Sequence, residues 1–274
     1  TSLQEGIMAS RAAYRFFKHN DMDHLEKTLS ENRSKYFGCL IVTEGLFSMD
    51  GTIGQMDAIV KLAKKYDARV FIDQGHCIGV LGDKGLGTIE KFNVIDSTDM
   101  VMGLFSKGLG TMGGFIAADE SVIQWLKVYS KTHVFATTFP PSNAAATLAA
   151  IEIMETQPEL RTKLISNVKL FVKGLVEMGA LIDPNHYTPI VPIVIGDETK
   201  MGLIFQHLLN DGIFALPVVY PVVARNRCRF RFSVRADHTI SDIDYVLNSL
   251  KNAFKIANFR FEDVRAKTVG SKAA

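Results

Sequence analysis

Short apolar runs separated by a helical pattern organise the first half of the chain. Residues 37–43, 68–72 and 100–102 are predicted to be buried strands. Between the first two, residues 56–66 have the apolar spacing of an amphipathic helix. Strand, helix and strand in this order predict a βαβ unit with a right-handed crossover, and therefore parallel strands. The carboxyl ends of these strands would meet at one sheet edge, where ligands bind.

Helical and strand patterns continue to the end of the chain. Further helices are predicted at residues 3–18, 24–29, 121–130, 144–179 with a break near Pro158, 200–210, and from Ser241 onward. Strands are predicted at residues 190–195, 213–219 and 228–234. The patterns predict an α/β large domain over residues 1–155 and a small α+β domain over residues 156–274.

A glycine-rich loop with a single lysine follows the third apolar strand. Residues 103–115 place Lys107 between Ser106 and several glycines, and an apolar run at residues 115–117 predicts a second strand. Glycine allows close approach of the backbone to a ligand. A lysine held between two buried strands can lose its charge by desolvation and attack a carbonyl. The alternative is an exposed turn lysine beside a flexible loop.

The strand at residues 68–72 leads into two further polar side chains. Asp73 ends it, and His76 follows three residues later. A carboxylate, an imidazole and a lysine at successive strand ends favour pyridoxal phosphate (PLP), in which the lysine forms a Schiff base and the carboxylate keeps the pyridine nitrogen protonated. The alternative for Asp73 is an N-cap or turn aspartate.

Composition and charge argue against nucleic-acid binding, metal binding by cysteines and insertion into a membrane. The chain of 274 residues is 47% hydrophobic and 22% charged, with a formal net charge of +2, which gives no indication of nucleic-acid binding. Cys39, Cys77 and Cys228 lack metal-ligand spacing and fit reduced thiols in the cytoplasm. From these patterns, neither a secretory leader nor a transmembrane segment is expected.

Several motifs, in one order along nearly the whole chain, resemble the α-oxoamine synthases, the PLP-dependent family that includes serine palmitoyltransferase. The matching positions are residues 43–51, Asp73 with His76, residues 79–82, Ser106-Lys107, Gly113-Gly114, residues 135–141, and Arg231 ahead of His238-Thr239. The resemblance implies a fold-type I, aspartate aminotransferase-like architecture with a mainly parallel sheet in an N-terminally incomplete large domain.

The resemblance also assigns catalytic roles. Lys107 would hold PLP and carry the substrate proton, Asp73 would face the pyridine nitrogen, and His76 would lie near the phenolic oxygen. Arg231 would bind the carboxylate of the amino acid, a task suited to a guanidinium. Without the resemblance, an exposed arginine face on an alternating strand is the simpler interpretation of Arg231.

Hydroxyl side chains complete the implied cofactor site. Ser48 and Ser106 would help to hold PLP, although Ser48 alone could equally be a turn serine. Thr137, with Thr138 as second choice, would reach the phosphate of the partner subunit across a homodimer interface. A loop before a helix that begins with prolines is a compatible local interpretation.

The chain departs from the family in three respects. Leu104 stands where the family usually has a threonine that binds the cofactor phosphate, so weaker cofactor affinity or altered activity is expected. Gln74-Gly75 replaces residues that are often acidic or small, which is not expected to disable the site. The resemblance places residue 1 inside the large domain, with a cofactor-stacking histidine upstream of Thr1. The chain is therefore expected to be a fragment, a cleavage product or the ordered part of a longer chain.

The resemblance implies condensation of an amino acid with an acyl-CoA, with loss of CoA and CO2. Residues 105–107 and 113–116 look most like serine palmitoyltransferase, which favours L-serine, a long-chain acyl-CoA, 3-ketosphinganine as product and a place in sphingolipid biosynthesis. Three alternatives stay open: another branch that uses glycine or alanine, a non-catalytic partner subunit, and a PLP-binding fragment without activity.

Overall fold

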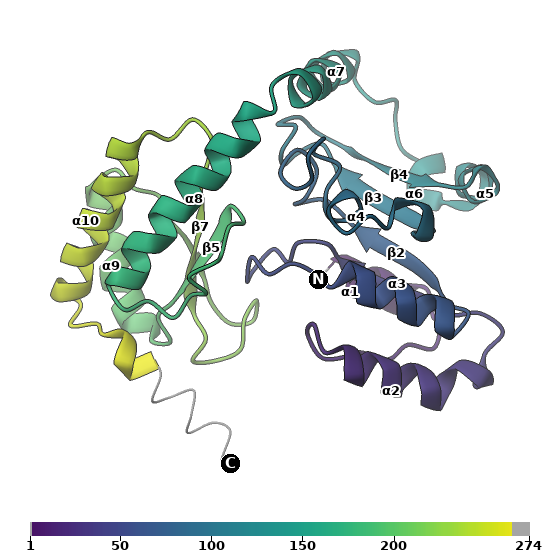
Figure 1. Ribbon diagram of the computed structural model, residues 1–274, viewed down its shortest axis with the longest axis horizontal. Helices are drawn as coiled ribbons and strands as arrows, with labels where there is room; N and C mark the ends of the chain where they lie inside the picture. The colour runs from purple at the N-terminus through teal and green to yellow at the C-terminus, as the bar shows by residue number, and fades with distance from the viewer. Residues whose placement is uncertain (1, 265–274) are drawn as a thin grey trace. The chain divides into compact units, whose positions relative to one another are not determined.

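The computed structural model describes residues 2–264, which form two compact units (Figure 1). The first unit contains the chain up to Phe47 and then Thr52–Pro158, and the second contains Ser48–Gly51 and the chain from Glu159 onward. The backbone therefore enters the second unit at Ser48, returns to the first at Thr52, and leaves it again after Pro158.

The first unit is built on a four-stranded sheet with the order β1-β2-β3-β4. Its strands are β1 (Leu40–Glu44), β2 (Arg69–Asp73), β3 (Met100–Leu104) and β4 (Gly114–Ala118). Its α-helices are α1 (Ser2–Ala9), α2 (Met22–Asn32), α3 (Met56–Lys65), α4 (Thr88–Lys91), α5 (Glu120–Tyr129), α6 (Lys131–Val134) and α7 (Pro141–Thr156). The strands β1, β2 and β3 are parallel and β4 is antiparallel to β3, so the predicted βαβ unit β1-α3-β2 is confirmed.

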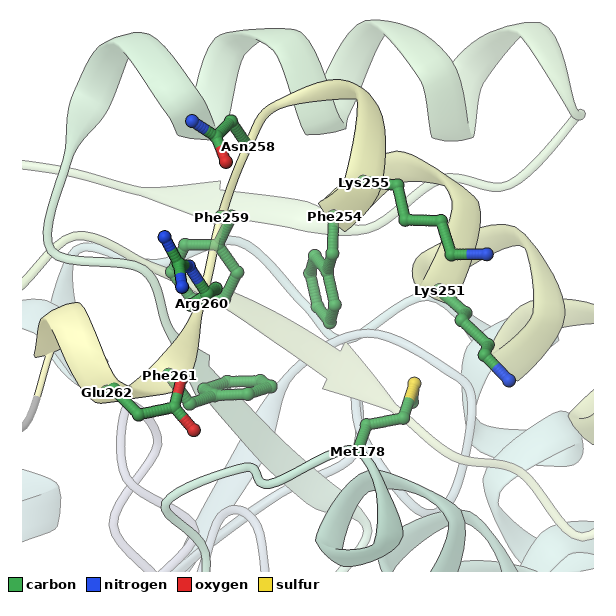
Figure 2. A pocket seen from close by; sticks show the side chains of 9 residues that line it. All are labelled: Met178, Lys251, Phe254, Lys255, Asn258, Phe259, Arg260, Phe261 and Glu262. Carbon is green, nitrogen blue, oxygen red and sulfur yellow. The ribbon is translucent and has the colours of Figure 1, made fainter.

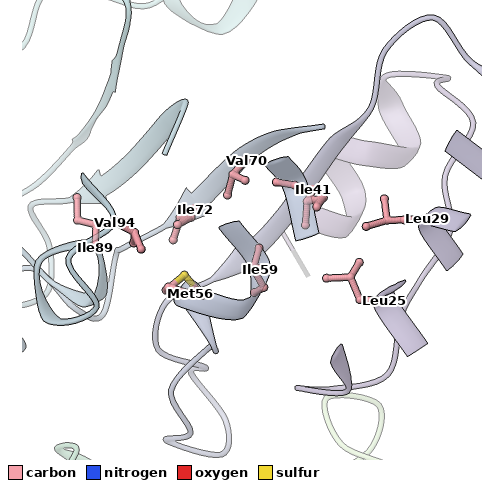
Figure 3. Packing of buried hydrophobic residues seen from close by; sticks show 10 residues of the cluster. Leu25, Leu29, Ile41, Met56, Ile59, Val70, Ile72, Ile89 and Val94 are labelled. Atoms are coloured by element: carbon pink, nitrogen blue, oxygen red, sulfur yellow. The ribbon is translucent and has the colours of Figure 1, made fainter. Parts of the chain in front are cut away.

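Buried aliphatic side chains hold α2 and α3 against the sheet (Figure 3). Val70 and Ile72 alternate on β2 and are fully buried, as are Met56 and Ile59 one helical turn apart on α3. The predicted strand and helix periodicities thus meet in one core. Each fully buried side chain of this kind stabilises the fold by about 1.5–3 kcal/mol. The packing therefore holds β2 in place, and with it the position of Asp73 at the end of the strand.

Three predictions for the first unit were wrong. The helix expected over residues 3–18 ends at Ala9, because α1 buries no residue and Arg11 adopts a left-handed backbone with φ 59°. Trp125, expected to pack, is 59% exposed and stacks on Tyr129. The strand after the lysine loop, expected to be buried, is the exposed edge strand β4.

Up to Val264, where the described residues end, the second unit is a three-stranded antiparallel sheet with three helices. Its elements are α8 (Glu159–Glu177), β5 (Ile190–Val194), α9 (Glu198–Asn210), β6 (Leu216–Val218), β7 (Arg229–Ser233) and α10 (Ile240–Ile256). The strand order is β5-β7-β6, so β7 is central and Phe230 on it is fully buried. The predicted break near Pro158 is confirmed, since α7 ends at Thr156 and α8 begins at Glu159.

Candidate active site

Asp73 lies at the carboxyl end of β2, where the parallel sheet presents its strand ends. It pairs in register with Glu44 of β1 and Met102 of β3. Its Oδ1 accepts a 2.7 Å hydrogen bond from the Gly75 amide. Burial raises the pKa of Asp73, and the Gly75 N–H partly opposes that effect. The Gly75 hydrogen bond comes from a neutral backbone amide and not from a cation. A half-buried carboxylate of this kind is suited to bind a positively charged ring nitrogen.

The lysine loop joins β3 to β4 and packs on the turn that follows Asp73. Phe105 N–H donates to Gly113 O at 3.0 Å, which closes the base of the loop. A Cβ added to Gly108 would lie 2.3 Å from the carbonyl oxygen of Ile78, so only glycine permits this approach. The loop that carries Lys107 is thereby held against the chain immediately after His76. Ser106 and Lys107 are exposed, and His76 is half-buried.

The segment between α6 and α7 packs against the lysine loop through two aromatic rings. Phe139, from the segment between α6 and α7, lies 5.8 Å from Phe105 between ring centroids. Its ring also covers Gly113, where an added Cβ would meet Phe139 Cε2 at 2.8 Å. Thr137 and Thr138 precede Phe139 and are exposed. Sequence reasoning named the two threonines as candidates and did not name Phe105 and Phe139, whose only sequence signal is their aromatic type in loops.

The two departures beside Asp73 have structural roles. Leu104 packs over Gly75, where an added Cβ would meet Leu104 Cδ1 at 2.8 Å. Gln74 is fully buried; its Nε2 donates to Thr88 Oγ1 at 2.6 Å and its Oε1 accepts from Thr88 N at 3.0 Å. The amide is thus fully used in a neutral, satisfied pair, and no buried charge is added next to Asp73.

The remaining predicted residues, Ser48 and Arg231, belong to the second unit. Arg231 lies in the middle of β7, and burial lowers its pKa. Its Nε is buried and has no hydrogen-bond partner among the described residues. The interpretation as an exposed arginine face is wrong, because the alternate arginine, Arg229, is 6% exposed and paired with Asp50. A half-buried guanidinium with an unused donor is suited to a carboxylate.

These groups form a donor set that fits PLP. The first unit supplies a carboxylate at a strand end, an imidazole on the following turn, and a lysine with neighbouring hydroxyls on a glycine loop. Such groups can respectively hold a ring proton, donate to a phenolic oxygen, and bind an aldehyde and a phosphate. Within residues 2–264, no cluster of three or more His, Cys, Asp or Glu side chains could hold a metal ion.

A separate hollow of about 470 Å³ lies at the end of α10 in the second unit (Figure 2). Its lining includes the buried rings of Phe254, Phe259 and Phe261, with Lys251 and Lys255 on its rim. None of the predicted site residues lines it, within the part of the chain that the structure describes. In that same part, no helix combines the length and apolar character needed to cross a bilayer.

Curated proteins similar to the chain include 8-amino-7-oxononanoate synthases. The chain is 38% identical over 257 residues to the 8-amino-7-oxononanoate synthase of Thermoanaerobacter pseudethanolicus, and 39% identical over 254 residues to 8-amino-7-oxononanoate synthase 2 of Bacillus subtilis. These alignments cover 94% and 93% of the chain. The chain spans 65% and 64% of the length of these relatives.

Solved structures similar to the chain include serine palmitoyltransferases. A serine palmitoyltransferase from S. paucimobilis with a bound PLP–myriocin aldimine matches 94% of the chain and 65% of its own length, with a TM-score of 0.90 and 28% identity. The serine palmitoyltransferase of Sphingomonas wittichii also gives 0.90, at 27% identity over 94% of the chain and 64% of its own. The predicted fold-type I architecture is confirmed.

Both kinds of relative are α-oxoamine synthases, in agreement with the resemblance found in the sequence. The model of one protein family, described as aminotransferase class I and II, matches residues 1–250. With its strand-end carboxylate, its lysine loop and its sheet topology, the chain belongs to the PLP-dependent aminotransferase class I and II family.

Proposed function

We propose that the protein is a PLP-dependent α-oxoamine synthase that condenses an amino acid with an acyl-CoA. The observation that carries this proposal is the contact of Gly108 with Ile78, which holds the Lys107 loop against the turn after Asp73 and His76. In the proposed reaction the amino acid loses its Cα proton, Cα bonds to the acyl carbonyl carbon, and the C–S bond breaks to release CoA. The carboxyl group then leaves as CO2 and a proton returns to Cα.

Three residues of the first unit are assigned to the chemistry. PLP, when bound, supplies an electron sink for the pair left at Cα. The Asp73 carboxylate holds a proton on the ring nitrogen, and the His76 imidazole donates to the phenolic oxygen. The Lys107 amine would hold the cofactor and, once freed by the incoming amino group, would take up the Cα proton and return it.

Binding and orientation are assigned to other side chains. Ser48 and Ser106 would hold the cofactor, and Thr137 or Thr138 would reach the phosphate in the partner subunit. The Arg231 guanidinium would take the amino acid carboxylate, which its unused buried Nε supports. Large exposed apolar side chains in the first unit support a homodimer, in which they would be buried; they include Trp125, Val128, Phe135 and Leu148. A mass of two chains by light scattering would test this.

The donor substrate has two candidates. The serine palmitoyltransferase branch, with L-serine, a long-chain acyl-CoA and a role in sphingolipid biosynthesis, is supported by the TM-score of 0.90. Another branch, with glycine or alanine, is supported by the higher identity of 38% to an 8-amino-7-oxononanoate synthase. Cys39, Cys77 and Cys228 are free, which supports a cytoplasmic location.

The visible absorbance spectrum with added PLP tests the proposal. We expect a band that Lys107→Ala abolishes and that shifts when the correct amino acid is added. L-serine, glycine and L-alanine would be titrated in turn, followed by an acyl-CoA chain-length series with CoA release as the readout. The measurements would use the chain as printed and the longest natural form of the protein.

The outcomes separate the alternatives. A Lys107-dependent band and CoA release would establish a synthase, and the effective amino acid would identify the branch. A band without CoA release in the longest form would favour a PLP-binding protein without activity. No band in the longest form would overturn the catalytic proposal and favour a non-catalytic partner subunit.

A further inference from the structure

The four-residue loop Ser48–Gly51 belongs to the second unit, and the residues that flank it along the chain belong to the first. Its ends, Phe47 and Thr52, are joined in the first unit by a 2.9 Å bond from Phe47 N–H to Thr52 O. His19 supports this base, because its Nε2 lies 2.8 Å from Thr52 Oγ1 and its ring packs edge-on to Phe47. The tip of the loop belongs to the second unit.

Arg229 of β7 makes the main polar contacts with the tip. Its Nη1 donates to the Asp50 carboxylate and lies 3.5 Å from Met49 O. Its Nε donates to Arg227 O at 3.2 Å, which orients the guanidinium. The Arg229 side chain is 7% exposed and that of Asp50 is 47% exposed, so the cation is the desolvated partner. Loss of the carboxylate would leave a buried, unpaired positive charge, which destabilises a fold far more than an exposed unpaired charge does.

A second anchor lies at Gly51. The buried Thr188 hydroxyl donates to Gly51 O at 2.7 Å. Gly51 has φ 65°, and a Cβ added there would lie 2.0 Å from Ile190 O, so the loop backbone rests directly on the start of β5. Ile190 pairs with Ser233 of β7, two residues from Arg231. The loop tip, β5 and β7 are thus one packed body.

We propose that Arg229 is a positioning residue that fastens the Ser48 loop to the strand carrying Arg231. The inference rests on the proposed function, in which Ser48 holds the cofactor and Arg231 binds the amino acid carboxylate. Arg229 contacts neither ligand in this scheme. Its pairing with Asp50 fixes the distance between two ligand-binding side chains that are 183 positions apart in the sequence (231 − 48).

A single displacement should therefore weaken two binding events together. Without the Arg229–Asp50 pair, Ser48 can move relative to β7. The cofactor bound by Ser48 and the amino acid bound by Arg231 are then no longer held at a fixed distance from each other. Misplacement of a binding group by about 1 Å costs up to about 100-fold in function, so a loss of about 10-fold or more in each affinity is expected.

Arg229→Met and Thr188→Val test the proposal, with Arg235→Met as the matched control. Methionine keeps much of the arginine volume without its charge, and valine keeps the shape of threonine without its hydroxyl. Arg235 forms an exposed ion pair with Asp237 just after β7, away from the loop. The dissociation constants of PLP and of the amino acid would be measured by absorbance titration, with melting temperature recorded for each variant.

We expect Arg229→Met to raise both dissociation constants about 10-fold or more, Thr188→Val to raise both less, and Arg229→Lys to be intermediate. Arg235→Met should change neither. A lower melting temperature with both constants unchanged in folded Arg229→Met and Thr188→Val would overturn the proposal and leave a purely structural pair. If Arg229→Met does not fold, Thr188→Val decides alone. Failure of the wild-type protein to bind PLP would instead overturn the proposed function.

Discussion

Leu104 stands where the resemblance to the α-oxoamine synthases implies a threonine, and its surroundings indicate a simple way to test the effect on PLP binding. It packs over Gly75 beside Asp73 and cannot donate a hydrogen bond. Leu104→Thr should strengthen PLP binding about 10- to 100-fold, the equivalent of about 1.5–3 kcal/mol for one donor to a charged group.

The matched control is Leu104→Val, which has the shape of threonine without the hydroxyl. Absorbance titration with PLP would be done on both variants. Equal affinity of the threonine and valine variants would show that the phosphate does not use a donor at this position.

Burial of Asp73, a proposed cofactor ligand, makes the free energy of unfolding depend on pH. Burial raises its pKa above the ordinary value of 3.8, so the folded chain binds this proton more tightly than the unfolded chain. The resulting stabilisation is present below the unfolded pKa and is lost as the pH rises through the folded pKa. Without PLP, ionised Asp73 therefore lowers the free energy of unfolding at pH 7.

Asp73→Asn should raise the melting temperature of the PLP-free protein at pH 7, since Asn retains an oxygen for the Gly75 amide. The gain should shrink as the pH falls toward 3.8, and PLP affinity should drop. Calorimetry across pH would measure this, with exposed Asp96→Asn as control. A lower melting temperature at pH 7 would contradict the expected cost of burial.

At the residue scale, chemistry-bearing side chains were easier to predict than the contacts that place them. Asp73 and Lys107 could be named as candidates because a strand pattern ends beside each of them. The packing of Phe139 on Phe105 has no such local signal, since it joins loops that are distant in the sequence. Arg229 had a signal, its alternation with Arg231, but its partner Asp50 lies 179 positions away and only the fold pairs them.

At the element scale, the His238-Thr239 motif that matched the family proves to begin a helix. Thr239 is the N-cap of α10, and its side chain and that of Asp242 bond reciprocally to the backbone as a capping box. Thr239→Ala should lower the free energy of unfolding by about 0.5–2 kcal/mol, because an amide of the first turn loses its acceptor.

Urea unfolding would measure this cost, with Thr156→Ala near the end of α7 as a control outside any N-cap. Thr239→Ser should restore most of the stability. Equal losses in Thr239→Ala and Thr156→Ala would contradict a capping role.

Element boundaries were predicted best where a buried face enforces them. The ranges of β2 and α3 were close to the prediction, since both contribute to the core in Figure 3. The helix at residues 3–18 failed because helical spacing alone does not stabilise a segment that buries nothing. Burial of β4 was overestimated because an apolar run does not reveal whether a partner covers it.

At the scale of the whole molecule, the second unit is not a continuous piece of sequence. A fragment of residues 159–274 would lack Asp50, leaving buried Arg229 without its carboxylate. Fusing residues 46–53 to that fragment through a flexible linker should raise its stability by about 1–3 kcal/mol, the cost of an unsatisfied buried charge.

Urea unfolding of the fragment, of the fusion, and of the fusion with Asp50→Ala would check this prediction. Asp50→Ala should remove most of the gain. A fusion no more stable than the bare fragment would show that the loop contributes little to the second unit.

The discontinuity of the second unit also bears on how such proteins can exchange parts. A recombination event near Pro158 falls between two helices, yet it separates Asp50 and Gly51 from their contacts in the second unit, Arg229, Thr188 and Ile190. A chimera of two relatives joined there takes the loop from one parent and the residues that bind the loop from the other. The crossover that preserves function must therefore carry four residues, Ser48–Gly51, together with everything after Pro158.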